Sequence, residues 1–325
     1  MNAAEPTLAV ENLKTYFYTR AGVVKAVDDV GFAVGPGKVL GIVGESGSGK
    51  TVTGFSILGL VDPPGRVVGG RVLFKGENLV GADEERLRAL RGGRIAMVFQ
   101  DPMMTLNPVL RIDTQMIEAV RAHDPTIGKA EARARAREAL GRVGIPSPDE
   151  RLRAYPHQFS GGMRQRVAIA IALINRPDLV IADEPTTALD VTIQGQILYE
   201  AQKLCRESGA ALIWITHDLS VIAGLADEVC VMYAGRAVEQ GTVDEVLDAP
   251  LHPYTRGLIG SVPSRNRRGA KLAQIPGMTP SLIDLPRGCA FKTRCGRADA
   301  ACEEGPPLTA PLPRRAVRCF HPYVG

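Results

Sequence analysis

One run of eight residues combines three glycines with a lysine and a threonine in the order G-x-x-x-x-G-K-T. It follows a short apolar run, Val39 to Val43, and precedes a helix-like stretch, which is the setting that a phosphate-binding loop needs. Glycines let backbone N–H groups turn inward around phosphate oxygens, and the helix start adds a positive dipole end. Lys50 is expected to reach the β- and γ-phosphates and the Thr51 hydroxyl to bind Mg²⁺. The run consists of Gly44, Glu45, Ser46, Gly47, Ser48, Gly49, Lys50 and Thr51.

A pair of carboxylates closes another apolar run. Leu179 to Ala182 is typical of a buried strand, and Asp183 and Glu184 follow it directly. Taken alone, acids at a strand end are more often a helix cap or a solvated turn. Beside a phosphate-binding loop, however, Asp183 fits an acid that positions Mg²⁺, and Glu184 fits a general base that polarises the attacking water.

A second run of small residues, Ser160-Gly161-Gly162, stands before a helix-like stretch and is followed by Gln165. A serine at a helix start is an anion site by the same physics as the first loop, although an N-cap with flexible glycines is the simpler interpretation. A nucleotide has one γ-phosphate, which the first loop already holds. The second site is therefore expected to act on the ATP of another chain, so that two chains pair face to face.

The elements that carry these motifs follow the order of a parallel α/β fold. Apolar runs typical of buried strands alternate with helix-like stretches. Residues from about 101 to 156 are mostly helical in pattern. The expected strands are Leu8–Val10, Val23–Val27, Val39–Val43, Leu179–Ala182, Ala211–Thr216 and Val229–Tyr233, and the expected helices include Lys129–Val143, Arg164–Ile174 and Ile193–Glu207.

The bulk composition is that of a globular protein. Of 325 residues, 45% are apolar and 23% charged, and the net charge of +4 is too mild to indicate a nucleic-acid binder. No apolar run approaches the roughly 20 residues of a membrane-spanning helix. The N-terminus shows no signal segment, so we expect the protein to stay in the cytoplasm.

Two cysteines stand apart from the others. Cys205 and Cys230 lie in apolar surroundings and are expected to be small buried core residues.

After about residue 260 the periodicity fades and Pro, Gly and Arg become frequent. We therefore expect a nucleotide-binding domain at residues 1–260 and a C-terminal extension at residues 261–325, which has too few apolar residues for a core of its own. The extension has the cysteine spacing C-x5-C-x6-C-x16-C. Cytoplasmic disulfides are disfavoured, and four thiolates suit Zn²⁺ or an iron–sulfur cluster, with free thiols as the remaining alternative. These residues are Cys289, Cys295, Cys302 and Cys319.

The ordered motifs resemble those of the ABC ATPases. Ser160-Gly161-Gly162 with Gln165 resembles the signature motif, Gln100 the Q-loop glutamine, Asp190 the D-loop acid and His217 the switch histidine. The likeness covers residues 8 to about 250. It implies a RecA-like parallel sheet core, an antiparallel β subdomain, a helical subdomain at about 101–160 and an irregular C-terminal extension.

The resemblance also implies a role for each matching residue. Glu184 would be the catalytic base and His217 would contact the γ-phosphate. Asp190 would couple the two sites of the dimer, and Gln100 would report to a membrane subunit. The Mg²⁺ ligands would be Thr51, Gln100 and Asp183. Phe17 or its neighbour Tyr16 would stack on adenine, with Tyr18 as a further candidate.

The C-terminal extension resembles that of ATPase subunits from oligopeptide, dipeptide and nickel importers. The likeness rests on His252 to Leu258, on Ile275-Pro276-Gly277, on the four cysteines and on Asp101 to Pro108. It implies a second, different ATPase subunit, two transmembrane permease subunits and an extracytoplasmic solute-binding protein, with this chain at the cytoplasmic face of the membrane. It also implies a structural [4Fe-4S] cluster on the four cysteines.

Peptides are the expected cargo by resemblance, with nickel or another small solute as the alternative. Two rival classes are weighed against this prediction. A soluble ABC ATPase of nucleic-acid repair or translation usually carries tandem cassettes or long coiled coils, and nothing in the sequence resembles them. A kinase with a phosphate loop would have no use for Ser160-Gly161-Gly162. The sequence leaves the choice between a homodimer and a heterodimer open.

Overall fold

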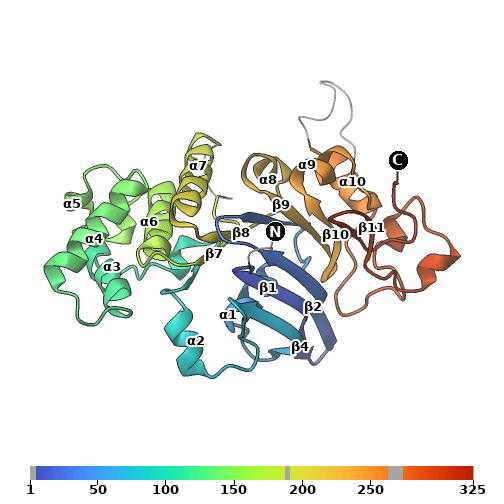
Figure 1. The fold of residues 1–325 in the computed structure, drawn as a ribbon, viewed down its shortest axis with the longest axis horizontal. Helices are drawn as coiled ribbons and strands as arrows, with labels where there is room; N and C mark the ends of the chain where they lie inside the picture. The colour runs from blue at the N-terminus through green and yellow to red at the C-terminus, as the bar shows by residue number, and fades with distance from the viewer. Residues whose placement is uncertain (1–4, 187–190, 263–273, 325) are drawn as a thin grey trace. The chain divides into compact units, whose positions relative to one another are not determined.

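The computed structural model describes residues 5–186, 191–262 and 274–324. They fall into two compact units. The first is built from residues 1–7, 34–38 and 81–214, and the second from residues 8–33, 39–80 and 215–325. The boundary between residues 214 and 215 falls inside one strand, β8 (Ala211–Thr216). Figure 1 shows the elements of both units in chain order.

The first unit has a short buried sheet in the order β8, β7 (Leu179–Asp183), β6 (Ile95–Val98). Every residue of β7 and β8 is buried, as their continuous apolar sequences predict. Strands β6 and β7 run parallel, with Val98 opposite Ala182. The residues that follow these two strands therefore leave the sheet at the same edge.

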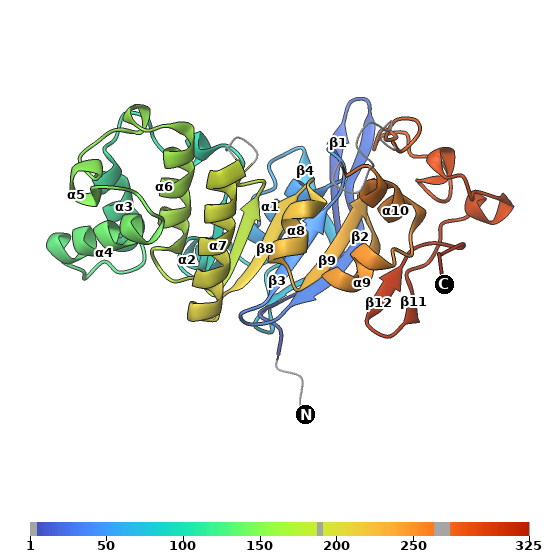
Figure 2. The same cartoon turned by 90° about the horizontal axis from the view of Figure 1, so that it is seen from above.

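The helices α3, α4, α5 and α6 of the first unit gather in one cluster (Figure 2). Helix α4 packs against α3 and α6 through Ala132, Ala136 and Leu140, which share one face at intervals of four residues. The charged remainder of α4 lies outside this stripe. The helices of this unit are α2 (Glu84–Leu90), α3 (Ile112–Arg121), α4 (Lys129–Arg142), α5 (Pro148–Arg151), α6 (Gly161–Leu173) and α7 (Val191–Ser208), with 3-10 turns η1 (Pro102–Met104) and η2 (Pro156–Gln158).

The second unit contains a four-stranded sheet in the order β2, β1, β4, β5. Its strands are β1 (Leu8–Thr19), β2 (Gly22–Val34), β4 (Gly65–Phe74) and β5 (Glu77–Asn78). Strand β1 pairs with β4 antiparallel, and its buried residues alternate with more exposed ones. The predicted strands at Leu8–Val10 and Val23–Val27 are confirmed but too short, because polar residues continue both strands on their outer faces.

A second set of paired strands in this unit runs β11, β12, β10, β9 and β3 in that order. Strands β3 and β9 are parallel, and the remaining pairs are antiparallel. The C-terminal extension thus contributes its two strands, β11 and β12, to the sheet that holds β3. The strands are β3 (Val39–Val43), β9 (Glu228–Tyr233), β10 (Arg236–Thr242), β11 (Thr309–Leu312) and β12 (Arg315–Val317).

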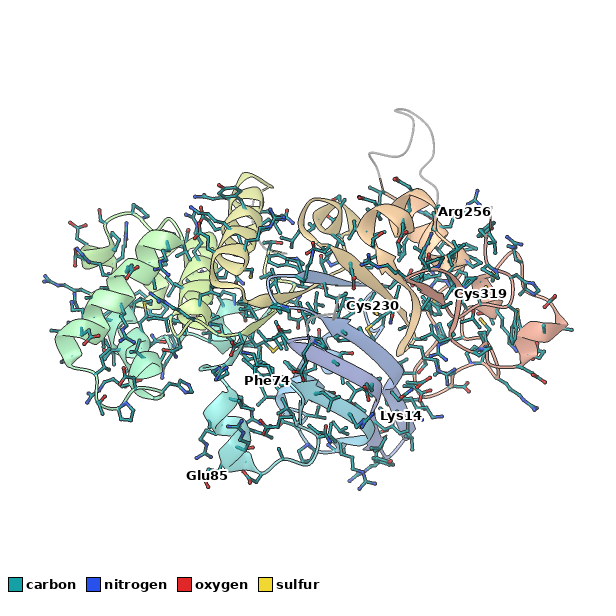
Figure 3. All side chains as sticks on the ribbon, viewed as in Figure 1. Lys14, Phe74, Glu85, Cys230, Arg256 and Cys319 are labelled. Carbon is teal, nitrogen blue, oxygen red and sulfur yellow. The ribbon has the colours of Figure 1, made fainter. Side chains whose placement is uncertain are left out.

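The helices of the second unit are α1 (Lys50–Leu58), α8 (Leu219–Leu225), α9 (Val243–Asp248) and α10 (Pro253–Gly260), with 3-10 turns η4 (Lys292–Arg294) and η5 (Ala300–Glu303). Cys230 lies on β9 and Cys319 in the extension (Figure 3). Cys205 and Cys230 are buried, as predicted, and burial raises the pKa of each thiol to about 12. Among the described residues, no helix combines the length and apolar character needed to cross a membrane.

Candidate functional site

The phosphate loop, residues 44–51, joins strand β3 to helix α1 in the second unit. Gly49 caps α1 with a φ of 98°, and a Cβ there would lie 2.1 Å from the carbonyl oxygen of Ala26. A Cβ on Gly44 would lie 2.2 Å from the carbonyl oxygen of Met232. Only glycine fits these two positions. A Cβ on Gly47 would meet nothing within 4 Å, so this part of the loop has open space beside it.

Lys50 is buried against the loop's own backbone. Its Nζ donates to the carbonyl oxygens of Gly44 at 2.8 Å and of Glu45 at 3.1 Å. The Ser48 hydroxyl is also buried and has no hydrogen-bond partner among the described residues. The first N–H groups of α1 lack partners within the helix. A cation, a buried hydroxyl and a helix start together favour a bound phosphate.

Three consecutive aromatic residues near the end of β1 are the candidates for the adenine contact. The Tyr16 hydroxyl donates to Asp28 Oδ1 at 2.7 Å, and burial together with this hydrogen bond raises the pKa of Tyr16 to about 12. Tyr18 is exposed, and Arg66 Cζ lies 4.5 Å from the centroid of its ring. Phe17 is half-buried and projects to the other face of the strand. Both tyrosines therefore already have polar or cationic partners.

Two carboxylates and a glutamine leave one edge of the first unit's sheet. The parallel register of Val98 with Ala182 places Gln100 and the pair Asp183 and Glu184 at this edge. Asp183 is buried, Glu184 half-buried and Gln100 exposed. Glu184 has a φ of 43°, a left-handed conformation that costs energy for any residue other than glycine. Strain of this kind concentrates at functional sites, where the surrounding structure fixes a side chain.

The first unit also presents the start of helix α6. The Ser160 side chain caps the helix and accepts from the Met163 N–H at 3.3 Å. Ser160 and Gly161 are exposed, and a Cβ on Gly161 would meet nothing within 4 Å. Gln165, in contrast, is buried, and its Nε2 has no hydrogen-bond partner among the described residues. The exposed helix start and Gln165 therefore have different surroundings, although one motif includes both.

His217 is exposed and follows strand β8 directly. Asp218 then caps helix α8 by accepting from the Ser220 N–H at 2.8 Å. The Asp218 N–H donates to Thr216 Oγ1 at 3.1 Å. These two hydrogen bonds fix the turn in which His217 stands.

The candidate residues divide between the two units. The second unit carries the phosphate loop, the aromatic residues of β1 and His217, and the first carries Gln100, the pair Asp183 and Glu184, and the Ser160 cap. Asp190 lies outside the described residues. The phosphate loop and His217 in the second unit, and Gln100 and the acid pair in the first, stand at the carboxyl ends of strands, where α/β sheets bind their ligands.

One contact on the phosphate loop has no signal in the sequence. Glu45 accepts from both Nη atoms of Arg294, in the C-terminal extension, at 2.6 and 3.0 Å. The Tyr254 hydroxyl accepts from the Glu45 N–H at 2.8 Å. These partners stand 249 and 209 residues from Glu45 in the sequence, so no local pattern marks them.

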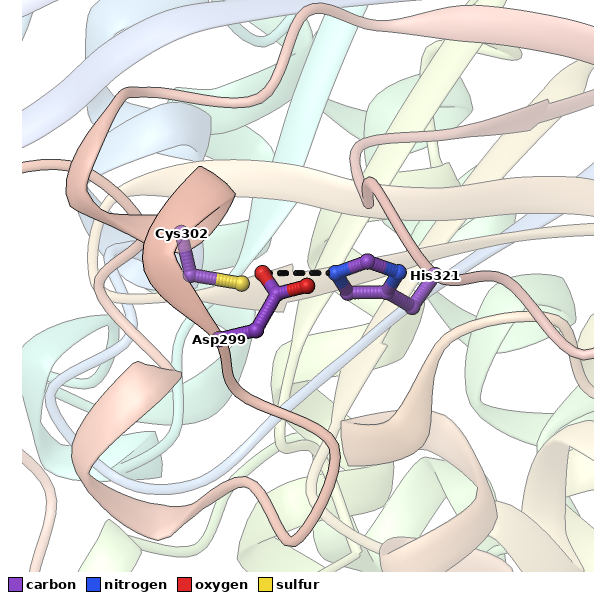
Figure 4. Close-up of side chains that lie close together, drawn as sticks. All are labelled: Asp299, Cys302 and His321. Carbon is purple, nitrogen blue, oxygen red and sulfur yellow. Dashed lines mark ion pairs between the residues drawn. The ribbon is translucent and has the colours of Figure 1, made fainter.

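The resemblance of the extension implies an iron–sulfur cluster on Cys289, Cys295, Cys302 and Cys319. This prediction is wrong. In the described part of the chain, the one group of possible metal ligands within 4.8 Å of one another joins Cys302 to Asp299 and His321, so a single thiol takes part (Figure 4). Burial raises the pKa of Cys289, and that of Cys319 to about 11. At this spacing, no group in the described part of the chain joins all four cysteines.

Two families match the sequence. The family described as "ABC transporter" matches residues 27–187, and "Oligopeptide/dipeptide transporter, C-terminal region" matches residues 238–302. The oligopeptide transport ATP-binding protein OppD of Salmonella typhimurium is 47% identical over 319 residues, covering 98% of this chain and 95% of that protein. The dipeptide transport ATP-binding protein DppD of Bacillus subtilis is 49% identical over 300 residues, covering 92% and 89%. These names describe ATP-binding proteins and mention no cluster, which is the second reason for the correction.

Solved structures share the fold. The ATP-binding cassette MJ0796, a dimer in a post-hydrolysis state bound to ADP and Pi, has a TM-score of 0.66 and 26% identity, covering 73% of this chain and 98% of that chain. CbiO1 from Clostridium perfringens, part of the ABC transporter complex cbiONQ, has a TM-score of 0.63 and 28% identity, covering 75% and 91%. The predicted fold class is therefore confirmed. Phosphate loop, ordered motifs and full-length relatives together show that this chain is an ATP hydrolase of the ABC transporter family, as an ATP-binding subunit of the oligopeptide/dipeptide type.

Proposed function

We propose that this chain drives the uptake of peptides by hydrolysing MgATP between two paired ATPase subunits. The observation that carries the proposal is the exposed, serine-capped start of α6. Gly161 there has open space around it, and the 13-residue helix behind it supplies a positive dipole end. In the pair, each phosphate loop holds one ATP and the partner's Ser160, Gly161 and Gly162 close over its γ-phosphate.

Each ATP is held mainly by the phosphate loop. Residues 44–51 wrap the phosphates, Lys50 reaches the β- and γ-phosphates, and Phe17 or Tyr16 stacks on adenine. Thr51, Gln100 and Asp183 would hold Mg²⁺, which would neutralise charge on the phosphate oxygens. The buried Ser48 hydroxyl and the glycine positions of the loop support this assignment.

Hydrolysis needs a base close to the γ-phosphate. Glu184 takes a proton from water while the water oxygen bonds to the γ-phosphorus and the bond to the β,γ-bridging oxygen breaks, releasing ADP and phosphate. His217 contacts the γ-phosphate, and Asp190 couples the two sites of the pair. Closure of the pair excludes bulk water and ties the reaction to movement of the membrane subunits.

The permease subunits dock beside Gln100. The segment that follows it exposes three apolar side chains, Met103, Met104 and Val109, with Met104 65% and Val109 75% exposed. Apolar side chains exposed together mark a protein interface. The full assembly has two such permease subunits, a second and different ATPase subunit and an extracytoplasmic solute-binding protein, and this chain lies at the cytoplasmic face of the membrane.

Within the chain, residues 1–260 form the nucleotide-binding domain and residues 261–325 the C-terminal extension. Peptide cargo is inferred from the relatives, which are named as oligopeptide and dipeptide transport proteins. The purified membrane complex in liposomes tests this cargo directly. Its ATPase rate should rise with peptides and with the solute-binding protein present; stimulation by nickel but not by peptides would contradict the peptide assignment.

The role of Glu184 is tested by Glu184→Gln. The variant should bind ATP but lose at least about 100-fold in turnover, because the amide cannot accept the proton. Glu207→Gln, an exposed change on α7, serves as the control with normal turnover. Near-normal turnover of Glu184→Gln would show that another group is the base.

A further inference from the structure

The phosphate loop is held from outside by the C-terminal extension, through Glu45. Arg294 makes a bidentate contact with the Glu45 carboxylate, at 2.6 Å to Oε2 and 3.0 Å to Oε1. Thr279, also in the extension, donates to Glu45 Oε2 at 2.8 Å. The Arg294 side chain is only 4% exposed, so solvent hardly competes for this contact.

Arg294 itself is fixed in place. Its Nε donates to the Pro276 carbonyl oxygen at 2.9 Å, and its Cζ lies 5.8 Å from the centroid of the Tyr233 ring and 5.9 Å from that of Phe291. Tyr233 ends strand β9, whereas Phe291 comes from the extension. A guanidinium with this many partners has one orientation, so it can impose that orientation on Glu45.

The backbone of Glu45 is held as well. Its N–H donates to the Tyr254 hydroxyl, and its carbonyl oxygen accepts from Lys50 Nζ. Tyr254 is fully buried, with its ring centroid 4.6 Å from that of Tyr233 and 5.5 Å from that of Phe291. Donor, acceptor and carboxylate of this one loop residue are therefore all occupied, two of them by groups outside the loop.

The charge of Glu45 matters for the same reason. Its carboxylate is one residue from Gly44 and five from Lys50, so an uncompensated negative charge there would repel a triphosphate. The Arg294 hydrogen bonds neutralise it and hold the pKa of Glu45 below its usual range. The loop tolerates an acid at this position because the extension supplies the cation.

We propose that Arg294 is a positioning residue of the ATP site, through which the C-terminal extension sets the shape and charge of the phosphate loop. Arg294 touches no reacting atom and acts through Glu45. Linkage makes the coupling reciprocal, so bound ATP must also tighten the extension. The proposal rests on residues 44–51 being the ATP-binding loop.

The test is nucleotide binding by the full-length chain, measured with a fluorescent ATP analogue. Arg294→Ala should weaken binding at least about tenfold, since it breaks two charged hydrogen bonds and bares the carboxylate. Lys292→Ala is the matched control, because this cation lies in the same 3-10 turn but pairs with Glu303, which is 65% exposed. It should leave binding within about twofold.

A double-mutant cycle with Glu45→Gln distinguishes two roles of Arg294: positioning the phosphate loop for ATP, or only anchoring the extension to the rest of the chain. The Glu45→Gln/Arg294→Ala double variant should bind ATP no worse than Arg294→Ala alone, because the repelling charge is gone. Independent, multiplying effects, or an Arg294→Ala variant with a lowered melting temperature and unchanged ATP affinity, would overturn the proposal. Lys50→Ala serves as the reference: if it binds ATP normally, the assignment of the loop fails instead.

Hydrogen exchange of the wild-type chain gives a readout that does not depend on any variant. Saturating ATP should slow amide exchange in the turn Lys292–Arg294. Exchange there that is the same with and without ATP would contradict the coupling.

Discussion

Arg315 of the C-terminal extension donates to Glu239 of strand β10 at 2.6 Å, and both side chains are almost fully buried. The other partners of the Glu239 carboxylate are the N–H groups of Leu251 and His252, at 2.7 and 2.8 Å. Arg315 is therefore the cation that neutralises a charge inside the second unit. Because Arg315 opens strand β12, which pairs with β10, the extension is part of the fold of this unit.

Removal of this cation should cost the second unit much of its stability. Arg315→Met leaves the buried Glu239 carboxylate without a counter-charge, which typically costs about 3–5 kcal/mol. Arg314→Met is the matched control, since Arg314 is 73% exposed and pairs with the exposed Glu228. We expect a loss of less than about 0.5 kcal/mol for the control. Urea unfolding of the purified variants measures both values.

Glu239→Gln in the Arg315→Met background provides the check on the cause. The amide oxygen can still accept from one backbone N–H, but the buried charge is gone. The double variant should therefore recover part of the lost stability. If it is less stable than Arg315→Met, the uncompensated charge is not the reason for the loss.

The pH dependence of stability should carry a contribution from His252. This side chain is buried and its Nδ1 accepts from the Tyr254 N–H; burial lowers its pKa from 6.5 to about 3. Between these pH values the unfolded chain binds a proton that the folded chain does not, so stability falls as the pH falls, by at most about 1.4 kcal/mol per pH unit. His252→Asn keeps the helix cap without the titration. Unfolding curves from pH 6.5 to 4 should be less pH-dependent for the variant, and equal slopes would disprove this role.

The pairing of two chains over ATP should be lost in Gly161→Asp. An acid in the first turn of α6 stabilises the helix through its dipole. A Cβ at this position would meet nothing within 4 Å, so the substitution causes no clash. The acid would, however, face the phosphates of the partner's ATP. We expect single chains to bind ATP normally while hydrolysis falls at least about tenfold from charge repulsion. The control is Gly128→Asp at the N-cap of α4, which also has open space and should hydrolyse normally. Equal turnover in both variants would show that the start of α6 does not act on the partner's ATP.

Local patterns carried most of the prediction of this site. The loop at Gly44–Thr51 and the acids after β7 were recognisable because a short buried strand precedes each of them. The approximate positions of the strands and helices could likewise be predicted from the apolar runs. These signals lie within about ten residues of one another, so the sequence alone displays them.

The contacts of the C-terminal extension were not predictable in this way. Arg294 and Arg315 stand among many other basic residues, and only the folded chain selects them as partners of Glu45 and Glu239. The surroundings of the cysteines were not predictable for a related reason. The sequence gives the positions of the four thiols but not their neighbours in space. In the folded chain, Cys302 lies beside the carboxylate of Asp299 and the imidazole of His321.

The apolar side chains beyond Gln100 give the last prediction. Met104 is 65% exposed and is the last residue of the 3-10 turn η1 in the first unit. Its burial against a permease subunit would stabilise the assembly by removing apolar surface from water. Met104→Glu should therefore reduce co-purification with the permease subunits and lower transport-coupled ATPase activity. Tyr199→Glu, at another apolar position that is 62% exposed, should assemble normally. Full recovery of the permease subunits with Met104→Glu would place the docking surface elsewhere, because a charge buried without a partner would destabilise any interface that covered it.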